Sequence, residues 1–254
     1  MDLPRNLFKY ALRARQPQLG LWCTLANAYA VEIVAGSGFD WLLLDTEHSP
    51  ADVPNVLGQL QALSGYGVSP VVRPAANDAV LIKRYLDIGV QSLLIPYVQN
   101  AEEARAAVAA TRYAPEGVRG VSALTRATRF GRVKSYAEVA ADELCVVVQV
   151  ETEAALAEIE AIAAVDGIDG IFVGPADLAA SLGHAGDLKH PRVVAALEDA
   201  IRRIQAAGRP AGILTGDEAF ARRCIEIGAL FTAVGVDAGI LARATEGLAA
   251  RFRA

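Results

Sequence analysis

The chain contains little sulfur, with three cysteines and one methionine among 254 residues. Cys23, Cys145 and Cys224 lie far apart, and no two of them form a C-x-x-C pair. An odd number of isolated cysteines excludes a disulfide scaffold and argues against a zinc ribbon. We therefore expect free thiols and a reducing compartment, the cytoplasm.

Long hydrophobic runs are also missing. No apolar stretch approaches the ~18 residues that a membrane-spanning helix needs. Residues 1–18 contain basic side chains but not the continuous apolar core of a signal peptide. A basic excess is missing as well, because 24 Lys and Arg are outnumbered by 29 Asp and Glu, for a net charge of −5. We expect no membrane segment and no nucleic-acid partner.

Apolar residues make up 53% of the chain and charged residues 21%, a balance that excludes a disordered protein. Short apolar runs rich in branched side chains recur eight times. Continuous rather than alternating runs are typical of parallel strands buried on both faces. The runs are LGLWC (19–23), WLLLD (41–45), PVVRP (70–74), SLLIP (92–96), CVVVQVE (145–151), GIFVG (170–174), AGILT (211–215) and FTAVG (231–235).

Segments with a helical period of 3.6 residues separate these runs. Capping residues mark their ends, and a further helix at 7–15 precedes the first run. Asp78 caps the first of these helices and Gly89 ends it, while Asn100 and Glu103 open the second as a capping box. Thr152 opens the third, which buries Leu156, Ile159 and Ile162. Pro191 begins the fourth and Gly208 ends it, and the fifth buries Phe220, Cys224 and Ile227.

Eight strands that alternate with helices over about 250 residues predict an α/β fold, a (β/α)8 TIM barrel with an N-terminal helix. A doubly wound open sheet is the alternative, but no G-x-G-x-x-G or Walker sequence follows any of the runs. No linker divides the chain, so residues 1–254 are expected to form one domain. Only the stretch 113–143 is too long for an ordinary connection.

Polar side chains stand where the predicted strands end, which is where the active sites of such barrels lie. Taken singly, each has an ordinary structural explanation: an ion pair for the arginine, a helix cap for Asp177, a surface charge for Glu47. His184 and His190 fall in a loop, where we expect solvated or capping roles. Five ionisable groups at the mouth of an apolar barrel, however, would be costly unless a metal or ligand organised them. The strand-end residues are Asp45, His48, Arg73, Gln149, Glu151 and Asp177.

These residue types suit one kind of chemistry. Glu151 and Asp177, from adjacent strands, offer carboxylate oxygens of the kind that Mg²⁺ and Mn²⁺ prefer, and no ligand spacing favours zinc. Asp45 precedes His48 by three residues and can orient its imidazole for proton transfer. Arg73 offers a planar fork for a carboxylate or enolate oxygen. The carboxylate of a small 2-oxo acid would lie on the backbone amides of the GPADL sequence, at Gly174, Pro175, Ala176 and Asp177.

The motifs LLLDTEHSP, VVRP, QVET and FVGPADL, in this order and spacing, resemble the class II pyruvate aldolases of the HpcH/HpaI family. The resemblance covers essentially the whole barrel and implies a phosphoenolpyruvate/pyruvate-domain-like fold. It implies reversible cleavage of 4-hydroxy-2-oxo acids to pyruvate and an aldehyde, as in the catabolism of aromatic compounds. It also implies a homo-hexamer with active sites near subunit interfaces.

The same resemblance implies roles for the strand-end residues. Glu151 and Asp177 would hold a divalent metal, Mg²⁺, Mn²⁺ or Co²⁺, with Gln149 and Asp45 around it. Pyruvate would bind to that metal, Arg73 would stabilise the enolate, and His48 paired with Asp45 would act as the base. Gln149 and residues 174–177 would contact the substrate.

The segment 117–137 contains five basic residues and no acidic one. A solvated surface loop is one explanation. The other is that this segment packs at a subunit interface near a neighbouring pocket and meets anionic substrates. Trp22, Leu214 and Val236, at or just beyond strand ends, would then form the apolar wall of that pocket. The basic residues are Arg119, Arg126, Arg129, Arg132 and Lys134.

Three alternatives stay open at this point. A Schiff-base aldolase needs a lysine at a strand end, but Lys9, Lys83, Lys134 and Lys189 fall in predicted helices or loops. An acyl-CoA lyase of the same superfamily needs a nucleotide pocket that no motif indicates. A barrel that binds without chemistry would be free to lose the strand-end residues, and here they are intact.

Overall fold

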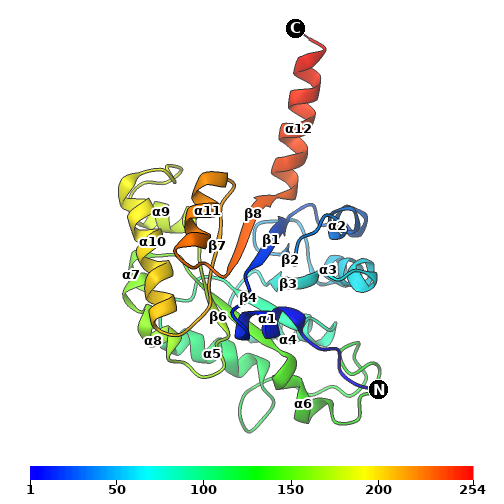
Figure 1. The fold of residues 1–254 in the computed structure, drawn as a ribbon. Coiled ribbons are helices and arrows are strands. Elements are labelled where there is room, and N and C mark those ends of the chain that lie inside the picture. Colours follow the sequence, from blue (N-terminus) through cyan, green and yellow to red (C-terminus); the bar gives the residue numbers. More distant parts are fainter. Residues whose placement is uncertain (254) are drawn as a thin grey trace.

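The structure is a computed structural model that describes residues 1–253. Eight parallel strands pair in chain order, and β8 pairs with β1 to close a barrel (Figure 1). This confirms the predicted (β/α)8 architecture, and each predicted run matches its strand to within one residue at either end. The strands are β1 (Gln18–Cys23), β2 (Trp41–Asp45), β3 (Ser69–Arg73), β4 (Ser92–Ile95), β5 (Cys145–Val150), β6 (Gly170–Val173), β7 (Ala211–Leu214) and β8 (Phe231–Val236).

The helices largely follow the predicted periodicity and caps. Asp78 and Asn100 cap α4 and α5 through their side chains, and the predicted N-terminal helix is α1. The helices are α1 (Leu7–Arg13), α2 (Ala28–Ala35), α3 (Val53–Ala62), η1 (Leu63–Gly65), α4 (Ala79–Asp87), α5 (Ala101–Thr111), α6 (Tyr136–Glu143), α7 (Glu153–Ala157), α8 (Ile159–Ala163), α9 (Pro175–Ser181), α10 (Pro191–Ala206), α11 (Glu218–Glu226) and α12 (Asp237–Arg251).

One predicted helix is wrong in its extent. The helix opened by Thr152 is interrupted at Glu158, whose backbone leaves the helical region (φ −101°, ψ 6°), so that α7 and α8 replace a single helix. Ile159 and Ile162 are still buried, as predicted. The burial pattern is the same for one helix or two, and periodicity alone therefore could not reveal the break.

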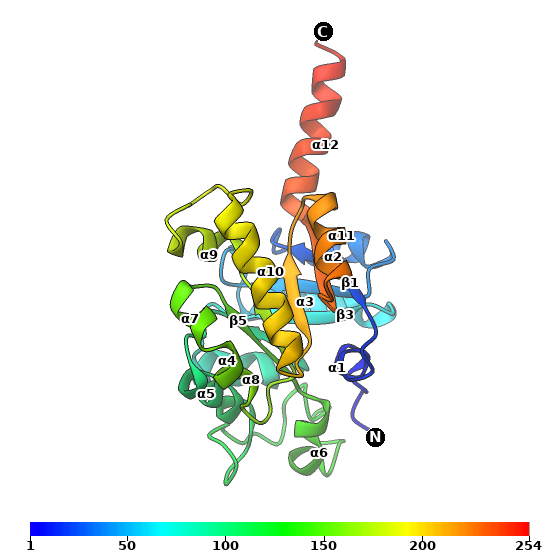
Figure 2. The same cartoon turned by 60° about the vertical axis from the view of Figure 1, so that its left-hand side comes forward.

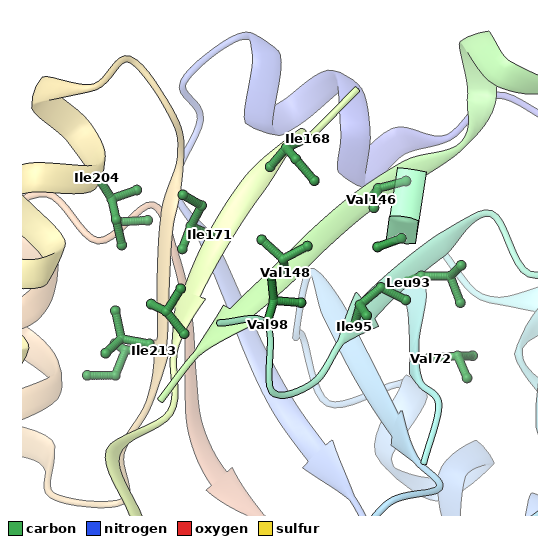
Figure 3. Packing of buried hydrophobic residues seen from close by; sticks show 14 of the residues in the cluster. Val72, Leu93, Ile95, Val98, Val146, Val148, Ile168, Ile171, Ile204 and Ile213 are labelled. Atoms are coloured by element: carbon green, nitrogen blue, oxygen red, sulfur yellow. The ribbon is translucent and has the colours of Figure 1, made fainter. Parts of the chain in front are cut away.

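The strands bury side chains on both faces of the barrel wall. The inward side chains form a core inside the barrel that includes Trp41, Phe172 and Phe231. The outward side chains pack against the surrounding helices, as Figure 3 shows for Val148 of β5 and Ile213 of β7. Burial on both faces explains why the strands read as continuous apolar runs.

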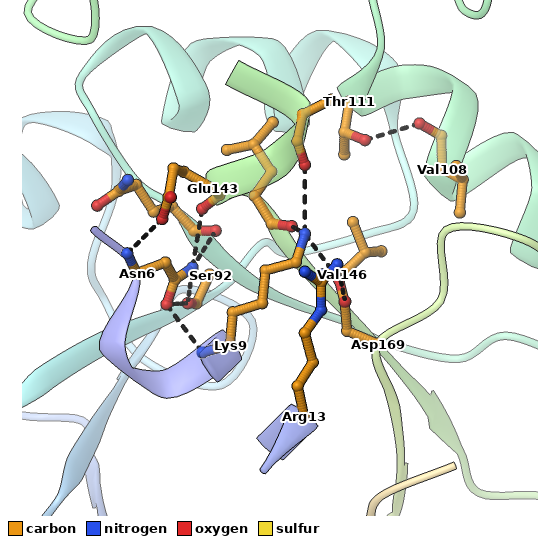
Figure 4. A network of polar contacts seen from close by, with 12 residues as sticks. Asn6, Lys9, Arg13, Ser92, Val108, Thr111, Glu143, Val146 and Asp169 are labelled. Carbon is orange, nitrogen blue, oxygen red and sulfur yellow. Dashed lines mark hydrogen bonds and ion pairs between the residues drawn. The ribbon is translucent and has the colours of Figure 1, made fainter. Parts of the chain in front are cut away.

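Helix α1 closes the N-terminal end of the barrel (Figure 4). The Asn6 side-chain amide donates to Ser92 Oγ (3.0 Å) and to the Glu143 carbonyl (2.9 Å). Lys9 is buried, donates to the carbonyl oxygens of Ala141 and Leu144, and lies 3.7 Å from the carboxylate of Asp169. Access to the barrel is therefore from the opposite end, where the strands finish.

The long stretch 113–143 holds the basic segment and α6. Arg119 is buried between the rings of Tyr113 and Tyr136 and lies 3.3 Å from the Asp87 carboxylate. Arg126 donates to the Ile88 carbonyl (2.8 Å). These two arginines thus attach the segment to the barrel. Four apolar side chains of the segment are exposed: Val118, Val121, Leu124 and Phe130.

Helix α12 differs from the others in its position. It projects away from the barrel, as seen from two directions (Figures 1 and 2). Among residues 1–253, no helix is both long and apolar enough to cross a membrane.

Candidate active site

The centre of the site is Arg73, the last residue of β3. In the parallel register Arg73 lies beside Asp45, the last residue of β2. Arg73 Nε donates to Asp45 Oδ1 (2.9 Å), and Nη2 donates to Oδ2 (2.7 Å). This two-point pair fixes the plane of the guanidinium. Burial raises the pKa of Asp45, but the hydrogen bonds and charge of Arg73 outweigh burial, and the pKa is lowered.

A second carboxylate, Glu47, lies on the other side of Arg73. Arg73 Nη1 is 2.8 Å from Glu47 Oε2, an ion pair without good hydrogen-bond alignment. The Glu47 side chain is only 18% exposed, and burial raises its pKa. A surface charge is the role predicted for Glu47, because this residue follows β2 and the alternation of strand residues does not extend to it. Its only signal was its position just beyond a strand end.

The predicted pair of His48 with Asp45 is wrong. Within residues 1–253 the His48 side chain makes no hydrogen bond to Asp45, because Arg73, Trp22 Nε1 (3.3 Å) and the Glu47 amide (3.0 Å) occupy that carboxylate. The imidazole is 66% exposed and lies 4.0 Å from Glu47 Oε2. His48 is thus free to face a ligand at the mouth of the barrel.

Trp22 has a different place from the one expected. The sequence predicts Trp22 in the apolar wall of a pocket, but the side chain is buried inside the barrel beneath Arg73, whose guanidinium carbon lies 5.0 Å from the ring centroid. This is a cation–π contact. Trp22 and the two carboxylates together hold Arg73 on three sides.

Glu151, directly after β5, is buried and tightly held. It accepts from the Tyr97 amide (2.8 Å) and from the side-chain amide of Gln149, as expected for residues two apart on one strand face. The pKa of Glu151 is raised to about 7, chiefly by burial and further by the charges of Asp177 and Glu47, which together outweigh the lowering effect of the two hydrogen bonds. Glu47, Glu151 and Asp177 follow the ends of β2, β5 and β6, so all three carboxylates belong to the same end of the barrel.

Gly174 brings the next strand close to Glu151. A Cβ at this position would lie 2.4 Å from Glu151 Oε2, so only glycine fits. Asp177 follows in the first turn of α9 and is exposed. The predicted amide cradle is smaller than expected, because the Gly174 amide donates to the Val150 carbonyl and Pro175 has no N–H. The amides of Ala176 and Asp177, in the first helical turn, remain available.

The site also contains an unsatisfied oxygen. Gln149 Oε1 is buried and has no hydrogen-bond partner among the described residues. Among residues 1–253, no three His, Cys, Asp or Glu side chains are grouped closely enough to hold a metal by themselves. The donors of Glu151 and Asp177 are hard oxygens, which suit a divalent cation whose remaining positions are filled by substrate or water.

An apolar groove of about 790 Å³ adjoins this site. It brings together four of the residues expected to contact a substrate: Pro175, Ala176, Leu214 and Val236. Helix α12 contributes one side of the groove through Gly239, Ile240 and Arg243.

Comparison with known proteins agrees with this geometry. The model of the HpcH/HpaI aldolase/citrate lyase family matches residues 18–244. The chain belongs to this family.

Among the relatives of this HpcH/HpaI chain, a pyruvate aldolase of Rhizobium etli is 67% identical over 252 residues, which cover 99% of each chain. A 4-hydroxy-2-oxo-heptane-1,7-dioate aldolase of Salmonella typhimurium is 58% identical over 249 residues, covering 98% of this chain and 95% of the other. The crystal structure of a family member from Burkholderia cenocepacia superposes with a TM-score of 0.93 at 40% identity, covering 98% and 100% of the two chains.

These comparisons confirm the family resemblance and the expectation of an aldolase, a carbon–carbon lyase. They do not support an inert binding barrel. A Schiff-base mechanism also lacks its lysine in residues 1–253: Lys9 lies at the closed end, Lys83 is in α4, and Lys134 and Lys189 are in loops.

Proposed function

We propose that this HpcH/HpaI family member is a metal-dependent pyruvate aldolase that reversibly cleaves 4-hydroxy-2-oxo acids to pyruvate and an aldehyde. The observation that carries the proposal is the arrangement at the barrel mouth. Glu151 and Asp177 provide an anionic site at this end of the barrel, and Arg73, a buried cation, is held there by its hydrogen bonds to Asp45. The names of the relatives support the same reaction.

Glu151 and Asp177 would hold the divalent metal. A bound Mg²⁺, Mn²⁺ or Co²⁺ would act as a Lewis acid toward the keto and carboxylate oxygens of a 2-oxo acid. Gln149 Oε1, buried without a partner, has the polarity to meet the cation, its water or the substrate. Gly174 has no side chain, and this leaves room for the Gln149 amide group beside Glu151.

Arg73 would stabilise the enolate oxygen. Its guanidinium is already held by Asp45, Glu47 and Trp22, so no reorganisation is needed when negative charge develops on the substrate. Asp45 and Glu47 act through Arg73 and are positioning residues in this account.

His48 would carry out the proton transfer at the 4-hydroxyl group. It is the histidine adjacent to this cluster, and its exposed imidazole has a ring nitrogen that can take up or donate a proton at the mouth of the barrel. The substrate carboxylate would lie on the amides of Ala176 and Asp177. The aldehyde portion would extend into the groove along Leu214 and Val236.

Two finer assignments follow the family resemblance. We propose that the chain assembles as a homo-hexamer. We also propose that its 4-hydroxy-2-oxo acid substrates are those formed during the breakdown of aromatic compounds.

The test is the release of pyruvate from 4-hydroxy-2-oxo acids, followed with lactate dehydrogenase and NADH. We expect activity that disappears after chelation and returns with Mg²⁺, Mn²⁺ or Co²⁺. Malyl-CoA is the control substrate, since an acyl-CoA lyase would cleave it instead. Cleavage of malyl-CoA alone, or pyruvate release that chelation does not affect, would overturn the proposal.

A further inference from the structure

A second cavity, which we call the closed-end cavity, lies beside α1 at the end of the barrel opposite the active site. Its volume is about 300 Å³, at the lower end of the range for pockets that bind small molecules. Asp169 precedes β6 and Gly174 follows it, so the length of this strand, ~16 Å, separates the cavity from the active site. The cavity is lined by five basic residues from three parts of the chain: Lys9, Arg13, Arg15, Arg112 and Arg209.

Two of these arginines are used by the fold. Arg209 donates to the carbonyl oxygens of Ala163 (2.7 Å) and Val165 (3.2 Å), at the end of α8. Arg15 donates to the carbonyl oxygen of Gly208 (2.6 Å), just after α10. A basic side chain in such a place compensates the partial negative charge of a helix C-terminus. These contacts explain Arg15 and Arg209 without a ligand.

Lys9 has a partner too, whereas Arg13 is only weakly held. Lys9 Nζ lies 3.7 Å from the carboxylate of Asp169, which also accepts from the Val146 amide (3.0 Å). Arg13 points toward the same carboxylate (Figure 4), but its Nη2 is 3.9 Å from Asp169 Oδ1, which is beyond hydrogen-bond distance. The carboxylate of Asp169 is therefore committed to Lys9, and the guanidinium of Arg13 can meet another anion.

Arg112, directly after α5, has no partner for its charge. Its side chain is half-buried, yet it makes no hydrogen bond and no ion pair within residues 1–253. Gly167 leaves the space for it, since a Cβ at this position would lie 3.2 Å from Arg112 Nη2 and 2.6 Å from Val108 Cγ1. Gly167 also has a φ of +93°, which other residues rarely adopt. A partly buried charge without a partner is costly, and a bound anion would remove that cost.

The lining of the closed-end cavity favours a phosphate ester over other anions. Arg13 and Arg112 come from the ends of two different helices, α1 and α5. A phosphate group presents three acceptor oxygens in different directions, whereas a planar carboxylate is matched by a single guanidinium. Asp142 and Asp166 also line the cavity, and both are exposed without an ion pair within residues 1–253. Their carboxylates accept hydrogen bonds and so suit the hydroxyl groups of an ester.

We propose that the closed-end cavity binds a small phosphate ester that carries hydroxyl groups. The phosphate lies between Arg13 and Arg112. The hydroxyl groups donate to Asp142 and Asp166. Such a ligand joins α1, the end of α5 and the loop before β6, and it stabilises the chain because it binds only the folded state. The inference does not rest on the proposed reaction.

The first test is calorimetric titration of the full chain with glycerol 3-phosphate, and with inorganic phosphate and glycerol in separate titrations. We expect one glycerol 3-phosphate to bind per chain, inorganic phosphate to bind more weakly, and glycerol not to bind. Equal affinities for glycerol 3-phosphate and inorganic phosphate would contradict the role of Asp142 and Asp166. Absence of binding by both phosphates would overturn the proposal.

Substitutions of the two arginines test which side chains hold the phosphate. For Arg112→Gln we expect the Kd for glycerol 3-phosphate to rise about tenfold or more, as for the loss of a hydrogen bond between charged groups. Arg13→Gln changes an exposed side chain without affecting folding and should raise the Kd similarly. Arg105→Gln, exposed on α5 and outside the cavity, is the matched control and should bind normally. An unchanged Kd in both Arg112→Gln and Arg13→Gln, or an equal rise in Arg105→Gln, would contradict the assignment.

The second test locates the ligand on the molecule by hydrogen–deuterium exchange. We expect glycerol 3-phosphate to slow the exchange of backbone amides in residues 166–169 and 208–210, which line the closed-end cavity. Exchange in residues 174–177, at the active site, should stay the same. Slower exchange in residues 174–177 with no change in residues 166–169 would show that the ester binds at the active site, and this result would overturn the inference.

Discussion

At the scale of single residues, the site depends on the surroundings of Arg73. Its three neighbours are Asp45, Glu47 and Trp22, and none of them is placed to contact a substrate as freely as His48 is. The sequence indicated most of these residues, because active sites of barrels lie at strand ends. The sequence could not indicate which of these side chains form pairs. Asp45 is three residues from His48 in the sequence, but the register of β2 and β3 places Asp45 beside Arg73.

Replacing His48 tests its role as the proton-transfer group. For His48→Ala we expect a loss of ~10²–10⁴ in kcat, the usual effect of removing a positioned base. The melting temperature should not change, because the imidazole is exposed. His184→Ala, in the loop before α10, is the control and should retain full activity. A His48→Ala enzyme with normal turnover would contradict the assignment.

Glu151→Gln tests the metal site with little change in shape. We expect Mn²⁺ binding, measured by calorimetry, and turnover to be lost. Burial raises the pKa of Glu151, and the charges of Asp177 and Glu47 add to this, so a neutral side chain should not lower the melting temperature of the metal-free protein. Glu153→Gln, two residues away and exposed, is the control. Normal metal affinity in Glu151→Gln would show that the ligands lie elsewhere.

The Asp45–Arg73 pair makes a prediction about pH. Because the folded-state pKa of Asp45 is lowered, its contribution to stability is present above the unfolded value of about 4 and is lost as pH falls through the lower folded value. Asp45→Asn should therefore cost about 3 kcal/mol at pH 7, as expected for one partner of a buried pair.

The measurement is urea denaturation of both proteins from pH 7 to pH 3. The difference between them should shrink below about pH 4, the unfolded pKa of an aspartate. Glu246→Gln is the control: it breaks the exposed ion pair of Glu246 with Arg243 and should not change the free energy of unfolding at any of these pH values. A difference that is independent of pH would mean that Asp45 stabilises the fold through packing alone.

At the scale of elements, periodicity predicted where helices and strands lie, but not which surface each one meets. Asp78 and the apolar residues after it fixed α4, because capping and burial both act within one helical segment. The break at Glu158 left the same apolar pattern as an unbroken helix.

The basic segment 117–137 gives a prediction at this scale. Arg119 pairs with Asp87 and Arg126 donates to the Ile88 carbonyl, whereas Arg129 is exposed. If the segment meets anionic substrates of a neighbouring copy, Arg129→Gln should raise KM several-fold for aldehydes that carry a carboxylate and leave neutral aldehydes unaffected. Lys134→Gln, also exposed, measures the effect of net charge alone. An equal change for both classes of aldehyde would remove the hypothesis.

At the scale of the whole molecule, the barrel separates stability from chemistry. Helix α1 and its polar contacts close one end, and the outward apolar layer holds the strands in register. The charged groups of the candidate site lie at the other end, where a metal and a substrate can compensate the cost of their burial. The fold could be predicted because most strand residues are buried, on both faces of the barrel wall, which gives the strands a strong and continuous apolar signal.

The central claim is that this site makes the methyl protons of pyruvate acidic, and it can be tested without knowing the aldehyde. Proton NMR in D₂O measures the exchange of the pyruvate methyl protons for deuterium. The account predicts enzyme-catalysed exchange that requires Mg²⁺ or Mn²⁺, is lost in Glu151→Gln, and is strongly reduced in Arg73→Lys. Exchange that continues at an undiminished rate after chelation, or in Glu151→Gln, would contradict it.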